Sequence, residues 1–153
     1  MVYSMQFQNF SSTEFTRSLS GSSIDAVLQN LNKRPSGHLK AHSGLEELSA
    51  DQNALSFIAT GDIDLYCTWY DATSGERLGI KIHVPVQVLG IGTGPYWYYA
   101  WDQGKGINDA YQWHQIGDPA DVKEFDMQHF KVQARPEAHH DSLKVLVTIQ
   151  DKK

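Results

Sequence analysis

The stretch from Gly61 to Trp101, GDIDLYCTWYDATSGERLGIKIHVPVQVLGIGTGPYWYYAW, decides the fold of this chain. Every second residue from 63 to 69 is apolar, and the same alternation returns from 78 to 84. A period of two is typical of a strand that has one face on a core. Residues Asp71 to Gly75 are turn formers, and Pro85 lacks the N–H that a strand ladder requires. The stretch therefore predicts a β-hairpin that ends at Pro85.

Shorter alternations predict further strands on both sides of this hairpin. They are predicted at 2–7, 13–19, 54–60, 96–101, 111–116, 130–134 and 143–149, with a turn from Pro136 to Asp141 and a loop over 37–53. Ser22 begins a capping-box pattern, and apolar residues spaced along one helical face predict a helix over 22–32. The predicted fold class is all-β, an antiparallel β-sandwich of about 8–10 strands with one or two short helices. The predicted core includes Leu65, Trp69, Ile80, Ile82, Val145 and Val147.

Length and composition place the chain among single globular domains. It has 153 residues, of which 41% are hydrophobic and 20% charged, so residues 1–153 are expected to form one domain. The formal net charge of −5 argues against nucleic acid as a partner. The start of the sequence lacks the features of a signal peptide, so we expect a cytoplasmic protein as synthesised, with non-classical secretion as the alternative. The single cysteine, Cys67, falls on the inward face of a predicted strand and should be a packed thiol.

The polar residues do not form a pattern that indicates catalysis. Gly90 to Gly94 is spaced like a phosphate loop, but it lacks the lysine and the following helix. His38 and His42 are four residues apart, a ligand spacing that needs a helix, which Pro35 disfavours. We therefore expect no metal, no cofactor and no enzyme activity. An enzyme or small-molecule carrier built on the sandwich is the third-ranked hypothesis.

Aromatic residues are concentrated in one predicted strand. Tyr96, Trp97, Tyr98, Tyr99 and Trp101 occupy both of its faces, and one core cannot bury both. One alternate set should therefore be partly exposed, where a tyrosine or tryptophan suits a sugar ring or a membrane interface. The competing interpretation is a second cluster of packed rings beneath a helix or a long loop.

The order of motifs resembles a known family. Ala59-Thr60-Gly61 leads into the hairpin, which ends at Ile82-His83-Val84-Pro85, and an aromatic block and a last strand at 143–149 follow. This order resembles the actinoporin-like cytolysins and, more distantly, the fungal fruit-body lectins, which share one β-sandwich fold. The resemblance covers His38 to Trp101 and the last strand.

The resemblance implies a head-group site. In that family a Val-Pro segment and nearby tyrosines cradle phosphocholine, and Pro85 matches the proline by position. His83 stands where the family usually has a small hydroxyl residue, Ile91 lies near an expected tyrosine, and Tyr111 corresponds to a later tyrosine-rich segment. The pore-forming members also carry an amphipathic helix before the first strand, whereas the first strand predicted here begins at Val2. We therefore expect membrane or glycan binding without permeabilisation.

Two function classes rank first. The leading hypothesis is a lectin-like protein that binds a glycan or a phospholipid or sphingolipid head group at a membrane surface. The alternative is an actinoporin-type pore-forming cytolysin, which would form a homo-oligomer on sphingolipid-containing membranes. The predicted ligand-binding residues are His83, Pro85, Tyr96, Trp97, Tyr98, Tyr99, Trp101, Tyr111 and Trp113.

Overall fold

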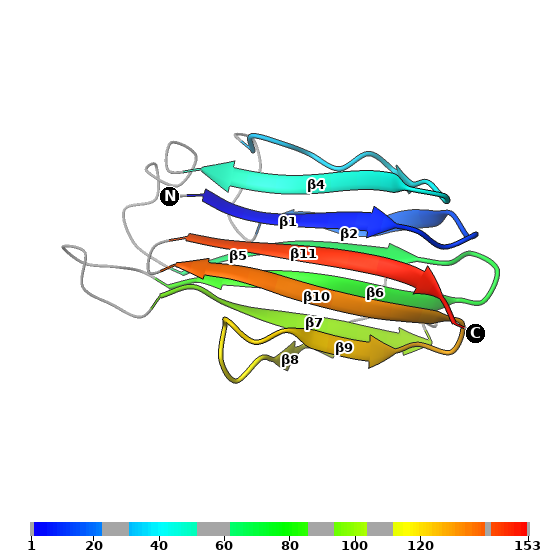
Figure 1. Cartoon of the computed structure of the whole chain (residues 1–153). Helices are drawn as coiled ribbons and strands as arrows, with labels where there is room; N and C mark the ends of the chain where they lie inside the picture. Colours follow the sequence, from blue (N-terminus) through cyan, green and yellow to red (C-terminus); the bar gives the residue numbers. More distant parts are fainter. Residues whose placement is uncertain are drawn as a thin grey trace.

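Two packed β-sheets make up the fold (Figure 1). The structure, a computed structural model, describes residues 2–22, 31–51, 62–85, 94–103, 112–139 and 142–152. One sheet has five strands in the order β4-β1-β11-β10-β9, and the other has six in the order β3-β2-β5-β6-β7-β8. The predicted all-β sandwich is confirmed, and these described ranges contain no helix.

The strands differ in length and direction. The five-stranded sheet consists of β1 (Val2–Asn9), β4 (Gly44–Asp51), β9 (Lys123–Asp126), β10 (Phe130–His139) and β11 (Ser142–Asp151). The six-stranded sheet consists of β2 (Phe15–Ser22), β3 (His38–Leu39), β5 (Ile63–Tyr70), β6 (Glu76–Val84), β7 (Tyr96–Gln103) and β8 (His114–Gln115). Strands β1 and β11 run parallel, with Tyr3 opposite Leu143, whereas the other pairs of described strands are antiparallel.

The predicted hairpin is formed by β5 and β6. Ile63 lies opposite Val84, and β6 ends one residue before Pro85. In the turn, the backbone N–H of Gly75 donates to the carbonyl of Asp71 over 2.8 Å. Gly75 has a φ of 79°, a conformation that favours glycine. The sequence of the turn therefore accounts for its geometry.

The core lies between the sheets and contains the residues predicted for it. Leu65, Trp69, Ile80, Ile82 and Val145 are fully buried, and Val147 is 1% exposed. The rings of Phe7 and Trp69, from opposite sheets, meet edge to face at 5.8 Å. Cys67 is also fully buried, and this burial raises the pKa of its thiol. The alternating apolar residues of both sheets thus interlock as expected for a sandwich.

Two predictions of irregular structure are wrong. Residues 37–53, predicted to be a loop, include β3 and β4. Among the described strands, β4 has β1 as its one neighbour and lies at the edge of its sheet, so it needs few apolar residues, and Leu48 and Ala50 are its buried apolar ones. Strand β10 continues through Pro136, where a turn was predicted. Because β9 pairs with β10 only as far as Ala134, no donor is required on that side of Pro136.

Some predictions fall outside the described residues. They concern most of the helix over 22–32, the strand over 54–60, most of the glycine-rich loop, and Tyr111. Beyond the gap, Leu31 and Asn32 are not helical, and Lys33 forms an isolated bridge with Ser49. Within the described ranges, no helix is of a length and apolarity that would let it cross a membrane.

Candidate functional site

The outer face of the six-stranded sheet carries a cluster of polar and aromatic side chains. The register of β5, β6 and β7 places Asp64, His83 and Tyr96 in one row across the strands. Tyr66, Lys81 and Tyr98 form the next row. Alternate residues of the same strands, such as Ile80 and Ile82, are buried in the core. We call this cluster the aromatic platform, and it consists of Lys81, His83, Tyr96, Tyr98, Trp113 and the two carboxylates at His83, those of Asp62 and Asp64.

His83 is fixed at one end of the platform. Its Nδ1 lies 2.7 Å from Oδ1 of Asp64, and its Nε2 lies 3.0 Å from Oδ2 of Asp62. The imidazole also packs against Tyr96, with 4.8 Å between the ring centroids. The His83 side chain is only 16% exposed, whereas those of Asp62 and Asp64 are 54% and 35% exposed. The two carboxylates therefore hold the histidine, and both of their side chains remain partly exposed.

Trp113 and Lys81 form the other end of the platform. The Lys81 ammonium lies 4.4 Å from the centroid of the Tyr98 ring and 5.1 Å from that of Trp113. The Trp113 indole lies against β6 at Gly79. A Cβ at position 79 would lie only 3.1 Å from Cη2 of this indole. Glycine at 79 thus lets the indole lie close to the strand.

Tyr96 and Tyr98 connect the two ends. Their ring centroids are 5.8 Å apart, and both side chains are half-buried. Burial, and next the neighbouring Tyr96, raise the pKa of Tyr98. The phenol of Tyr98 is therefore neutral near pH 7, so that its hydroxyl can both donate and accept a hydrogen bond.

The remaining predicted residues of β7 point into the sandwich. Trp97 is fully buried, and its indole N–H donates to the carbonyl of Pro119 over 3.0 Å. Tyr99 and Trp101 are partly buried against the core. The alternation of β7 therefore divides the predicted aromatic set in two, and Tyr96 and Tyr98 are the members that join the platform.

Tyr99 closes one edge between the sheets. Its ring stacks on Phe125 of β9 at 5.2 Å and packs against His114 of β8 at 5.3 Å. The Lys123 ammonium lies 5.2 Å from the same ring. These contacts give Tyr99 a structural role. Pro85 is half-buried just beyond β6, and Tyr111 lies outside the described residues.

Several residues of the site were not among those predicted. Asp62, Asp64 and Tyr66 alternate with apolar residues of β5, which indicates the outer face but does not indicate a site. Lys81 lies between the apolar residues Ile80 and Ile82, which indicates the outer face of β6, but its position over two rings is not indicated by the sequence. No signal in the sequence near Gly79 indicates that an indole from a distant segment lies against it.

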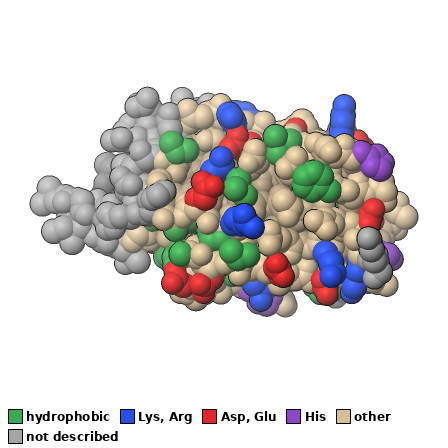
Figure 2. Space-filling model, in the orientation of Figure 1, with side chains coloured by type: hydrophobic (Ala, Val, Ile, Leu, Met, Phe, Trp, Pro, Cys, Tyr) green, Lys and Arg blue, Asp and Glu red, His purple; other side chains and the backbone are tan. Residues whose placement is uncertain are grey.

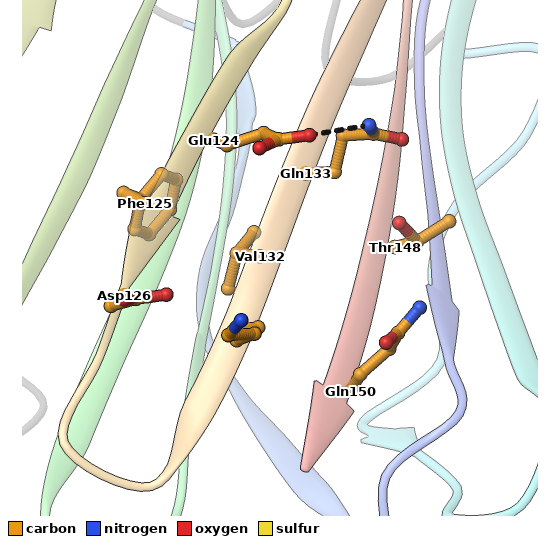
Figure 3. Close-up of a pocket in the computed structure, with 8 residues that line it drawn as sticks. Glu124, Phe125, Asp126, Val132, Gln133, Thr148 and Gln150 are labelled. Atoms are coloured by element: carbon orange, nitrogen blue, oxygen red, sulfur yellow. Dashed lines mark hydrogen bonds between the residues drawn. The ribbon is translucent and has the colours of Figure 1, made fainter. Parts of the chain in front are cut away.

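A second candidate lies on the outer face of the five-stranded sheet. A shallow hollow of about 250 Å³ is lined by Glu124, Phe125, Asp126, Lys131, Val132, Gln133, Thr148 and Gln150. Gln133 Nε2 donates to Oε1 of Glu124 over 2.9 Å across its upper rim (Figure 3). On this face acidic and basic side chains are interspersed and hydrophobic ones are scattered (Figure 2). Only one aromatic ring, that of Phe125, lines the hollow, and Tyr99 already stacks on it.

A buried carboxylate at the end of the β5–β6 hairpin has a structural role. Glu76 is fully buried and accepts hydrogen bonds from the backbone N–H groups of Gln128 and His129. Its Oε2 lies 2.8 Å from Nδ1 of His129. These bonds connect the turn between β9 and β10 to the hairpin in the other sheet. In the part of the chain that the structure describes, no three His, Cys, Asp or Glu side chains could hold a metal ion.

The sequence matches no protein-family model, and no curated protein is significantly similar to it. The site must therefore be interpreted from its own chemistry. The platform combines aromatic faces with carboxylate acceptors and one ammonium donor, which is a set suited to binding. Among the described residues, the cysteine is buried and cannot act as a nucleophile at this surface.

Proposed function

We propose that this protein is a lectin-like binding module that recognises a glycan or a lipid head group through the aromatic platform. One observation carries the proposal: Tyr96, Tyr98 and Trp113 lie half-buried around Lys81 and His83 on the outer face of a sheet, outside the core. Aromatic side chains with one apolar face and one wet end are suited to such ligands.

The polar groups of the platform support the same proposal. Sugar hydroxyls can donate to the carboxylates of Asp62 and Asp64 and accept from the Lys81 ammonium. The apolar face of a sugar ring can stack on a tyrosine. Rigid side chains cost little entropy when they bind, and His83 is already held by two carboxylates and a ring. Aromatic walls with a few placed polar groups are typical of small-ligand sites.

A binding screen over neutral glycans and over vesicles of defined head group tests the proposal. The informative variant is Tyr98→Ala, and the matched control is Gln133→Ala in the hollow of the other sheet. We expect Tyr98→Ala to weaken binding by about tenfold or more, as for the loss of one central aromatic contact. Gln133→Ala should bind like the original chain. Retained affinity in a folded Tyr98→Ala protein would contradict the proposal.

Two further measurements separate the alternatives. Since the chain carries a net charge of −5, binding should depend only weakly on salt, unlike attraction to an anionic surface. Vesicles that bind the protein should keep an enclosed dye. Rapid dye release from sphingomyelin vesicles would instead favour the pore-forming cytolysin.

A further inference from the structure

Within the aromatic platform, the rings of Tyr98 and Trp113 form a cage, and the side chain of Lys81 fills it with a positive charge. The Lys81 ammonium lies over both Tyr98 and Trp113, at 4.4 and 5.1 Å from the ring centroids. Both distances are within the range of a cation–π contact, which extends to about 6 Å. Lys81 is half-buried, and the close approach of Trp113 to Gly79 holds the indole near the strand. The Lys81 ammonium therefore occupies one face of each of these two rings before any ligand arrives.

This arrangement opposes a choline-type ligand. Quaternary ammonium groups are recognised by the faces of aromatic rings. To reach the faces of Tyr98 and Trp113, such a group would have to displace the Lys81 ammonium or lie beside a like charge. Displacement would cost the Lys81 ammonium its contacts with both rings. A second positive charge beside it would be repelled, and this repulsion is stronger where solvent is partly excluded.

The rest of the platform opposes an anionic ligand. Asp62 and Asp64 flank His83 at the end away from Trp113, and their carboxylates are partly exposed. An anion bound to Lys81 across the platform would meet this negative charge. A neutral polyhydroxylated ring avoids both conflicts, since its hydroxyls can donate to the carboxylates and accept from the ammonium.

We propose that Lys81 sets the specificity of the aromatic platform: its ammonium blocks the cage formed by Tyr98 and Trp113 against choline-type head groups, so that the ligand is a neutral glycan. The choice of ligand rests on the proposed function, whereas the blocked cage rests on the contacts of Lys81 alone. The two parts can therefore fail separately.

The experiment compares the original chain with Lys81→Met and Lys81→Arg. The methionine removes the charge and keeps an unbranched stem, and the arginine keeps a cation that can lie over the rings. Tetramethylammonium and phosphatidylcholine vesicles are titrated by calorimetry, and melting temperatures confirm that each variant is folded. Lys81→Met should bind tetramethylammonium about tenfold or more tightly than the original chain, as expected when two ring faces become free. Lys81→Arg should not gain this binding.

A double variant tests whether the tighter binding of tetramethylammonium by Lys81→Met occurs at the cage. Adding Tyr98→Ala to Lys81→Met should abolish the new binding, because one of the two ring faces is removed. Tight binding of tetramethylammonium by the original chain, or no gain in Lys81→Met, would overturn the blocked cage. A gain in Lys81→Met together with a screen that is negative for both the glycans and the vesicles would support the blocked cage and remove the proposed function.

Discussion

The two faces of strands β5, β6 and β7 are built from alternate residues of the same segments, yet they differ in how they are held. On the inner face, Cys67, Ile80 and Trp97 are fully buried and contact apolar neighbours. On the outer face, Lys81 and His83 are held by rings and carboxylates, and their neighbours remain partly exposed. Apolar contact thus accounts for the fold, and the directed polar contacts of the other face are available to a ligand.

The strongest test of this contrast is the accessibility of Cys67, on the inner face. The chain has one cysteine, so alkylation reports on this position alone. Native protein should react about a thousandfold or more slowly than unfolded chain, because reaction requires opening of a stable domain. Burial also raises the pKa of the thiol, which reduces the reactive thiolate. Measured alkylation rates with and without denaturant check this, and similar rates would show that β5 is not packed.

The next test compares adjacent residues of β7. Trp97→Ala should lower the free energy of unfolding by about 3–5 kcal/mol, because it empties a fully buried site. Tyr98→Ala should cost about 1 kcal/mol or less, since it removes a half-buried ring and one cation–π contact. Urea denaturation measures both values. Equal losses would mean that the two faces contribute equally to the fold.

Gly79 tests how closely the outer face is packed. A Cβ there would lie 2.5 Å from Cγ2 of Thr68, so Gly79→Ala should cost about 1–3 kcal/mol through overpacking. Gly117→Ala is the matched control, because nothing lies within 4 Å of a Cβ at that position. The melting temperature of Gly79→Ala should therefore be lower than that of Gly117→Ala. If the melting temperature of Gly79→Ala equalled that of the original chain, the side chains of Trp113 and Thr68 would be shown to move aside freely.

The smallest expected effect is on the titration of Tyr98. Because the pKa of Tyr98 is raised, the folded state favours the neutral phenol. Its contribution to stability is fully present below the ordinary tyrosine pKa of about 10, and it is lost as the pH rises through the folded value. Absorbance of the phenolate should show a late-titrating group that Tyr98→Phe removes. A titration curve without that late group would contradict the burial of Tyr98.

The fold was largely predictable because the inner faces of its central strands are strictly apolar. Strands β5, β6 and β11 show this alternation, and their predicted core residues are buried. Strand β4 was missed because two adjacent glutamates, Glu46 and Glu47, interrupt its apolar pattern at the sheet edge. The parallel pairing of β1 with β11 was also missed, since no local pattern specifies which distant strands become neighbours.

The site was predictable only in part. The aromatic run indicated that one alternate set of β7 would be exposed, and the structure identifies this set as Tyr96 and Tyr98. The sequence could not show which set faces the core, because both sets are aromatic. Trp113 lies against Gly79, and Lys81 lies over Tyr98. Both contacts depend on how three strands pair, and the pattern of residues along one sequence does not specify this pairing.

The position of β11 between β1 and β10 constrains how the chain can acquire its structure during translation. The ribosome delivers β1 first and β11 last of the described strands. Until β11 emerges, no strand joins the β1–β4 pair to the β9–β10 pair. Apolar residues of β1 such as Met5 and Phe7 then lack the β11 residues that lie beside them in the complete sheet. Pairings between such distant segments form slowly and leave the nascent chain prone to aggregation. The five-stranded sheet therefore cannot be completed before β11 has emerged, and its separate strand pairs are prone to aggregation until then.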